Sequence, residues 1–316
     1  MFLDIVERFA CGQCGACCSQ DWLVTVDEAG YRRNERLFGE NGWMDEFRQA
    51  FIPLRTDADF GEYARIAKQE SGGCWFLNEK MLCRLQQLAG HEHLDTVCQW
   101  FPRYPMDTER GIELSLSFSC PVALEMALRE EPLRIVRSNE SPIGMSPTDF
   151  VVHVYPTQQS ARSPLRHYFE LEGHLIDIFQ TRTLRMPERL ALVRQTLQDL
   201  AHLTEAESPG EKLARLEREN YAKMDALASN ETIAMLKPCD WLLENFFVNF
   251  VFRKSIYAKG LEEAGQVLGL LEQRLGYYLV RPSGSDGNVE ELKDVLVRQE
   301  LELNHRGKRK PPAAES

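Results

Sequence analysis

Alternation of apolar and polar residues is clearest over GIELSLSFS, residues 111 to 119. Successive side chains of a strand point to opposite faces, so this pattern predicts a β-strand with one apolar face. That face carries Ile112, Leu114, Leu116 and Phe118. The segment leads directly into Cys120-Pro121, and proline suits the first position of a helix, which we predict over 121 to 129.

Helical periodicity dominates the second half of the chain. Ser163-Pro164 and Ser208-Pro209 each combine an N-cap residue with proline at the first helical position, and Met186-Pro187 keeps the proline. The stretch 210 to 228 has the pattern of a charged amphipathic helix. The segment WLLENFFVNFVF, 241 to 252, is almost entirely apolar, which predicts a central buried helix.

Other segments are less regular. Asp27 predicts the cap of a helix over 28 to 37, and residues 60 to 69 fit a short strand or a short helix equally well. We expect a flexible loop over 282 to 288 and a short helix over 289 to 304, followed by a basic tail without fixed structure.

Composition and charge narrow the class of protein. The chain has 316 residues, 43% of them hydrophobic, so it can bury a substantial core. Its net charge of −11 argues against nucleic acid as a partner and suits a partner that carries lysines. Neither a signal peptide nor an apolar run of the roughly 18 residues that span a membrane is present, so we expect a cytoplasmic protein.

Cysteines are distributed very unevenly. The first 120 residues hold eight of the nine, and the ninth is Cys239, for which we predict a buried apolar position. Four lie within CGQCGACC, residues 11 to 18, where Gly12 and Gly15 give the backbone freedom for tight turns. The eight are Cys11, Cys14, Cys17, Cys18, Cys74, Cys83, Cys98 and Cys120.

Metal ligation explains this clustering better than the alternatives. Disulfides suit exported proteins, and no export signal is present. A catalytic nucleophile needs one activated thiol beside a base, not eight thiols. Cys11, Cys14 and Cys17 match the opening of the ferredoxin run C-x2-C-x2-C, but Cys18 follows at once, so iron–sulfur and zinc stay open. His91 and His93 are further candidate ligands, although a solvated loop is the simpler interpretation.

The order of these motifs is similar to that of a known family. CGQCGACC, then GGCWFLNEKMLCRLQ, VCQWFPR and SLSFSCPVALEMAL resemble the CxxCxxCC cysteine-cluster family (YkgJ-type), described as zinc- or iron-chelating. Within it the chain looks most like the flagellin lysine-N-methylase (FliB) branch. IDIFQTRTLRMPERLAL and WLLENFFVNFVF extend the resemblance to roughly residues 8 to 270.

This resemblance implies a reaction and its cofactors. The reaction is methyl transfer from S-adenosylmethionine to lysines of flagellin or another lysine-bearing protein, and the implied metal group is an iron–sulfur cluster (4Fe-4S), with zinc as the alternative. The eight cysteines would ligate it. The chain lacks G-x-G-x-x-G after a strand, the fingerprint of the usual nucleotide-binding α/β fold, so the donor site cannot be placed by motif.

A polar stripe on the apolar segment 241 to 252 gives the only candidates for catalysis. Asn245, Asn249 and Arg253 recur at helical spacing, and Glu244 is a carboxylate that could position or deprotonate a lysine amine. The alternative is hydrogen bonding between helices in the core.

Together these patterns predict a mainly α protein whose loop-rich, metal-binding N-terminal region contains a small β element. The predicted parts are a cysteine-cluster domain over 1–130, a Pro/Ser-rich connection over 131–163, an α-helical domain over 164–281, and a loop, helix and tail over 282–316. Two other functions stay open: a zinc- or iron-chelating or redox-sensing protein, and a partner-binding helical protein with a structural metal. The sequence leaves the oligomeric state open.

Overall fold

The computed structural model describes the chain except for residues 55–60, 140–150, 205, 229–235, 281–286 and 306–316. Helices account for most of the regular structure, so the predicted mainly α class is confirmed. Within the described residues, no helix combines the length and the apolar character that crossing a membrane requires.

Contacts divide the chain into two compact units that are not consecutive stretches. Unit 1 contains Met1–Phe9, Arg103–Phe118 and Ala123–Gln299. Unit 2 contains Ala10–Pro102, Ser119–Val122 and Glu300–Ser316. The boundaries predicted at 130 and 163 stay a prediction.

Unit 1 is built around a five-stranded sheet in the order β7-β1-β6-β5-β8. The strands are β1 (Phe2–Leu3), β5 (Arg103–Thr108), β6 (Gly111–Leu116), β7 (Ile135–Val136) and β8 (Val152–Val154). β5 and β6 form an antiparallel hairpin, and β1 lies parallel to β6. The predicted strand over 111 to 119 is therefore confirmed through Leu116. Both of its faces are buried beyond Ile112, since Glu113 and Ser115 are as covered as Leu114.

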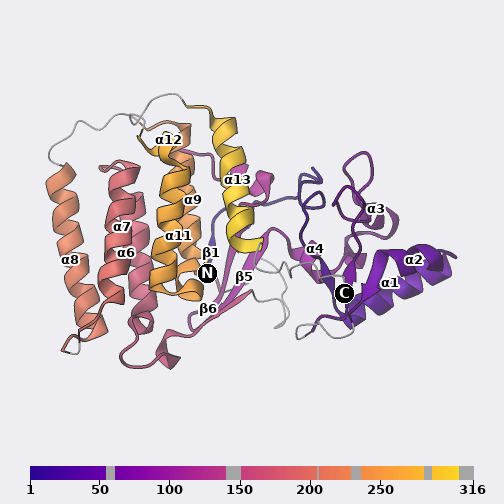
Figure 1. The fold of residues 1–316 in the computed structure, drawn as a ribbon, viewed down its shortest axis with the longest axis horizontal. Helices are drawn as coiled ribbons and strands as arrows, with labels where there is room; N and C mark the ends of the chain where they lie inside the picture. The colour runs from indigo at the N-terminus through magenta and orange to yellow at the C-terminus, as the bar shows by residue number, and fades with distance from the viewer. Residues whose placement is uncertain (55–60, 140–150, 205, 229–235, 281–286, 306–316) are drawn as a thin grey trace, which may run out of the picture. The chain divides into compact units, whose positions relative to one another are not determined.

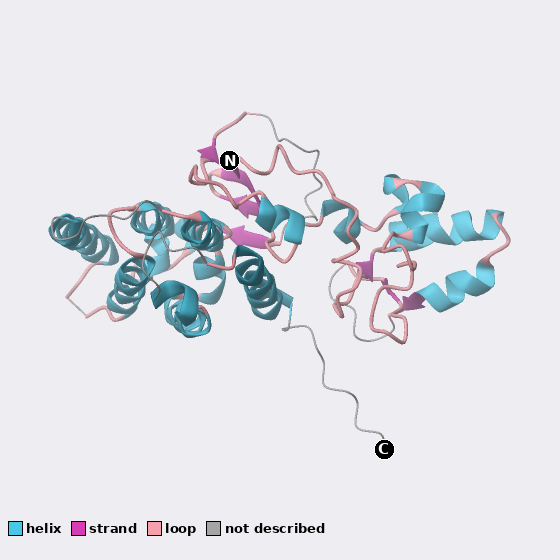
Figure 2. Cartoon of the chain, turned by 90° about the horizontal axis from the view of Figure 1, so that it is seen from above, coloured by secondary structure: helices cyan, strands magenta, loops and turns pink. Residues whose placement is uncertain are grey.

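Helices fill the rest of unit 1 and run side by side (Figure 1), as the end-on view also shows (Figure 2). The longer ones are α6 (Tyr168–Gln180), α7 (Met186–Ala201), α8 (Pro209–Ala228), α9 (Pro238–Phe252), α11 (Leu261–Arg274) and α13 (Val289–His305), whose last turns belong to unit 2. Shorter ones are α5 (Pro121–Glu125), which begins in unit 2, η3 (Pro156–Gln158), η4 (Pro164–His167), α10 (Ser255–Lys259) and α12 (Gly276–Val280).

The predicted helix starts follow from local chemistry. Ser208 accepts a hydrogen bond from the amide of Glu211 over 3.2 Å at the start of α8, so this cap is confirmed. Pro187 lies in the first turn of α7 as predicted, whereas Ser163 precedes the 3-10 turn η4 and does not cap it through its side chain. α9 is buried nearly all round and packs on α6 and β6, which confirms the predicted central helix.

Unit 2 combines short helices with a three-stranded sheet in the order β2-β4-β3. Its elements are β2 (Thr25–Val26), α1 (Glu28–Glu40), α2 (Met44–Ala50), β3 (Phe51–Pro53), β4 (Ala64–Ile66), α3 (Arg84–Ala89), η1 (His91–His93) and α4 (Thr96–Trp100). Asp27 caps α1 by accepting from the amide of Gly30 over 2.6 Å, as predicted. β4 shows that the segment 60 to 69 contains a strand.

An aromatic cluster forms the core of unit 2. Phe38, Phe47, Phe51 and Phe76 are almost fully buried, with ring centroids 4.9 to 6.2 Å apart. Most of these ring pairs are tilted and one is edge-to-face, so no two rings stack face to face, the arrangement that aromatic rings avoid. Cys74 belongs to the same core, and Cys18, Cys83 and Cys98 pack against it. These four thiols therefore lie in or against the same hydrophobic core.

Candidate functional site

All eight cysteines singled out by the sequence lie in unit 2. Cys120 belongs to it through the short segment Ser119–Val122, although the strand that precedes it belongs to unit 1. Cys239 lies elsewhere, in α9 of unit 1, where it is 1% exposed. The buried position predicted for Cys239 is confirmed.

The loop CGQCGACC is held by close backbone contacts. Gly15 has φ +69°, and a side chain there would place its Cβ 2.5 Å from the carbonyl oxygen of Met81. Only glycine tolerates both conditions without strain. The loop therefore packs directly on the turn that precedes Cys83. Gly12 meets Val122 in the same way, with Cβ 2.9 Å from a Val122 methyl, so the loop also touches the segment of Cys120.

Backbone pairing brings the later cysteines to this loop. The amide of Cys74 donates to the carbonyl oxygen of Cys18 over 2.7 Å. Cys74 also forms an isolated β-bridge with Lys68, and Cys83 forms one with Leu77. These contacts link the segments around Cys18, Lys68, Cys74 and Cys83 to one another.

Five thiols interact electrostatically, and we call them the inner thiols: Cys17, Cys18, Cys74, Cys83 and Cys98. The sulfurs of Cys17 and Cys18 are 3.8 Å apart. Their hydrogen bond lowers the pKa of Cys17 to about 7 and raises the pKa of Cys18. The side chains of these two sequence neighbours therefore face each other.

Burial raises the pKa of Cys74, Cys83 and Cys98, and neighbouring thiolates raise it further. Several buried thiolates close together would repel one another in a medium of low dielectric. A bound cation removes this repulsion, because a coordinated thiol is deprotonated and shares its charge with the metal.

The sulfur atoms of the inner thiols are soft ligands, so they suit a soft metal ion. Sulfur ligands select zinc or the iron of iron–sulfur clusters. Among the residues that the structure describes, no three His, Cys, Asp or Glu side chains converge closely enough to hold an ion as they are placed. The structure thus brings the inner thiols to one region without arranging them as a closed ligand shell.

The other cysteine and histidine candidates lie outside the inner thiols. Cys11 and Cys14 are exposed, and Cys120 is buried at the segment that Gly12 contacts. His91 is exposed in η1, and the Nδ1 of His93 is buried without a hydrogen-bond partner among the described residues. Neither histidine interacts with an inner thiol in any described contact.

The polar stripe of α9 is engaged within unit 1. Asn245 accepts from the amide of Leu133 and donates to the carbonyl of Ala127, both over 2.9 Å. Asn249 accepts from the hydroxyl of Ser115 and donates to the carbonyl of Leu116 over 3.0 Å. These are the core hydrogen bonds that formed the alternative to catalysis.

Glu244 and Arg253 are also held by neighbours. Glu244 is fully buried and accepts from Arg182 over 2.9 Å and from Arg189 over 3.0 Å. The guanidinium of Arg253 stacks 4.0 Å over the ring of Tyr104. Both carboxylate oxygens of Glu244 are thus engaged by arginine side chains within unit 1.

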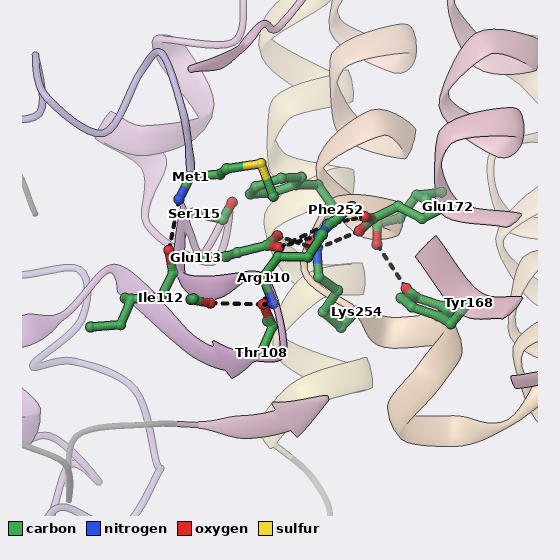
Figure 3. A network of polar contacts seen from close by, with 12 residues as sticks. Met1, Thr108, Arg110, Ile112, Glu113, Ser115, Tyr168, Glu172, Phe252 and Lys254 are labelled. Atoms are coloured by element: carbon green, nitrogen blue, oxygen red, sulfur yellow. Dashed lines mark hydrogen bonds and ion pairs between the residues drawn. The ribbon is translucent and has the colours of Figure 1, made fainter. Parts of the chain in front are cut away.

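Sequence reasoning missed a buried ionic network in unit 1 (Figure 3). Lys254 follows α9, adopts a left-handed conformation with φ 61°, and has a side chain that is 0% exposed. Its ammonium contacts Glu113 over 2.6 Å, the carbonyl of Phe252 over 2.9 Å, and Glu172. Lys254 thereby joins β6, α6 and the turn before α10.

Arg110 completes the network. It contacts Glu172 over 2.5 Å and Glu113 over 2.8 Å, so two cations face two buried carboxylates. Burial raises the pKa of Glu172, and the ammonium of Lys254 opposes this. The N-terminal amine of Met1 donates to Ile112 beside the network over 2.7 Å. The two cations balance the two carboxylates, and their hydrogen bonds hold β6, α6 and the turn before α10 together.

No local sequence pattern predicts this network, because its residues come from three distant parts of the sequence: Arg110 and Glu113, Glu172, and Lys254. The signal in the sequence was a lysine two residues after the end of a long apolar helix. A smaller polar cluster at the edge of the sheet was also missed. There Asp107 accepts from Tyr155 and lies 3.0 Å from the Nδ1 of His153.

Comparison with known proteins finds similarity over 129 residues, 40% of this chain. Over that stretch the chain is 27% identical to a lysine-N-methylase of Salmonella typhimurium and 26% identical to the flagellar biosynthetic protein FliU of Salmonella muenchen. A lysine-N-methylase of Salmonella choleraesuis is 26% identical. The match spans 31% of each lysine-N-methylase and 74% of FliU. No family model matches the chain. No solved structure matches it either.

Proposed function

We propose that this protein takes part in methylation of lysine side chains, with S-adenosylmethionine as the methyl donor and flagellin or another lysine-bearing protein as the acceptor. The observation that carries the proposal is the similarity to proteins named lysine-N-methylase, one relative being named as flagellar. The net charge of −11 favours encounter with a lysine-rich acceptor.

The chemistry is a transfer of one methyl cation equivalent. The neutral amine of lysine attacks the sulfonium methyl group, a C–N bond forms, and the C–S bond breaks with its electron pair remaining on sulfur. S-adenosylhomocysteine leaves, and the methylated ammonium releases a proton. The acceptor amine must lose its own proton first, which calls for a base or for a desolvated site.

The inner thiols belong to the same proposal as holders of a metal group. Cys17, Cys18, Cys74, Cys83 and Cys98 are the residues that would bind an iron–sulfur cluster (4Fe-4S) or zinc, with Cys11, Cys14 and Cys120 nearby in unit 2. Such a group supplies folding energy to a loop-rich region, and in the iron case redox chemistry as well.

A tritium transfer assay tests the proposal. Full-length protein purified without air is incubated with S-adenosyl-[methyl-³H]methionine and flagellin. We expect label on flagellin, located on lysines by mass spectrometry, and none on flagellin whose lysines have been acetylated. Absence of label with metal-loaded protein and with both flagellin and a mixture of lysine-rich proteins would overturn it.

One observation favours a second candidate, a metal-chelating or redox-sensing protein. The gathering of five thiols in unit 2 does not depend on methyl transfer. This function predicts metal that is lost to a chelator while the helices of unit 1 stay folded. Circular dichroism of the chelator-treated chain separates it from a structural metal, whose loss would unfold unit 2.

A further inference from the structure

A cavity in unit 2 lies over the exposed side of α1 and next to η1. Its volume is about 270 Å³. Arg32, Arg33 and Arg36 line it from α1, and His93 lines it from η1. Arg36 lies four residues after Arg32 and three after Arg33, so it shares a helix face with each of them, and all three side chains line the one cavity. Three arginines of α1 thus meet at one place on a helix that also carries Glu28, Glu35 and Glu40.

Not all of this positive charge is neutralised by neighbours. Arg32 is paired with Glu35 over 2.9 Å and with Glu28 over 3.7 Å. Arg36, by contrast, has no ion pair or hydrogen bond in any contact among the described residues, although Glu40 shares the cavity wall. Of the three arginines that line the cavity, Arg36 is therefore the one most free to bind an anion.

Two further polar nitrogens are buried here without a hydrogen-bond partner among the described residues. Arg33 donates through one terminal nitrogen to the carbonyl of Leu94 over 3.0 Å, but its Nε has no partner in the described structure. The Nδ1 of His93 is in the same state. Buried polar atoms without partners are rare and call for a ligand or water that satisfies them. Both residues line the cavity, so a group bound there can reach them.

The charges that oppose an anion are few. Glu40 is exposed on the wall, and buried Asp95 interacts with Arg33. Arg32 is already paired with Glu28 and Glu35, so Arg33, Arg36 and the imidazole of His93 are the groups left to face an anion beside these two carboxylates. A carboxylate is satisfied by one guanidinium fork, whereas a phosphate offers three oxygens and up to two charges, so several arginines at once suit phosphate better.

We propose that the cavity between α1 and η1 binds the phosphate group of a small phosphorylated molecule, held by Arg33, Arg36 and His93. This site is separate from the inner thiols and does not depend on methyl transfer. A volume of about 270 Å³ suits a phosphate with a small substituent and excludes an extended macromolecular segment.

Calorimetric titration of the full-length, metal-loaded protein tests the proposal, with inorganic phosphate and phosphoserine as probes and acetate for comparison. Ionic strength is kept constant with sodium chloride, because screening weakens non-specific attraction equally for all anions. We expect saturable binding of both phosphate probes, weaker binding of acetate, and roughly tenfold weaker phosphate binding for Arg36→Ala, the loss typical of one charge-assisted hydrogen bond.

Arg48→Ala is the matched control, because Arg48 is an exposed arginine of α2 whose partner is Asp45. Its phosphate affinity should equal that of the wild type. Arg33→Gln is a second variant that keeps most of the side-chain volume, and thermal unfolding verifies that it folds. Equal phosphate affinity in wild type and Arg36→Ala, or acetate binding as tight as phosphate binding, would overturn the proposal.

Discussion

The amide of Cys74 donates a hydrogen bond to the carbonyl oxygen of Cys18 over 2.7 Å. This contact joins the end of CGQCGACC to a cysteine in a distant part of the sequence. It is made by the backbone, so it holds the two residues close together whichever rotamers their side chains adopt. The inner thiols are therefore gathered by the fold of unit 2 itself.

The first prediction concerns metal content. Replacing Cys74 with serine should lower the bound iron or zinc of protein purified without air at least severalfold, because the thiolate is the ligand and a hydroxyl is a poor substitute. Elemental analysis and acid-labile sulfide measure the effect. Cys239→Ala is the control and should retain full metal content, since Cys239 lies in α9 of unit 1. Equal loss in both variants would contradict metal binding by the inner thiols.

The second prediction concerns Lys254. Lys254→Met leaves the carboxylates of Glu113 and Glu172 buried with Arg110 as their remaining cation. Removing one partner of a buried ion pair typically costs about 3–5 kcal/mol of unfolding free energy, which urea denaturation measures.

Two further variants check the cause. Lys259→Met removes a lysine that is paired with Glu263 near the surface, and it should cost less than about 1 kcal/mol. Adding Glu172→Gln to Lys254→Met should restore part of the stability, because it removes one uncompensated charge. A stability unchanged by Lys254→Met would show that the network contributes nothing.

The third prediction concerns pH. Burial raises the pKa of Asp95 to about 7, with Arg33 opposing the shift. In the unfolded chain the same carboxyl loses its proton near its usual pKa of about 4. Between these two pKa values the folded chain binds more protons than the unfolded chain does. The free energy of unfolding therefore falls as pH rises, by roughly 4 kcal/mol over the whole window.

Urea unfolding between about pH 4 and pH 8 measures this slope. Asp95→Asn removes the titrating group, so its stability should vary less with pH across the window. The variant should also be the more stable of the two chains above pH 7, where wild-type Asp95 is charged and buried. A slope identical to that of the wild type would assign the pH dependence to other groups.

The fourth prediction separates a structural from a catalytic role for Asn249. Asn249→Ala leaves Ser115 and the carbonyl of Leu116 without their partners, and should cost about 2–3 kcal/mol of stability. If Asn249 acts only in the core, methyl transfer per folded molecule stays near the wild-type rate at low temperature. A large loss of rate without loss of stability would support catalysis instead.

Local elements were largely predictable from the sequence. The cap at Asp27, the strand after Arg110, the proline start of α7 and the apolar helix α9 all depend on neighbouring residues, and all are present. The helix predicted over 121 to 129 is shorter, since α5 ends at Glu125. The start of the loop predicted over 282 to 288 lies outside the described residues, while the helix that follows it is present as α13.

The sequence by itself determined the mainly α class, several helix starts and the crowding of eight thiols near one end, because these depend on composition, periodicity and short spacings. Only the tertiary structure decided which thiols lie together and that Lys254, Glu113 and Glu172 form one buried network. Contacts between distant segments depend on how whole elements pack, and no local pattern encodes that packing. The cavity beside Arg36 depends on the same packing of α1 against η1.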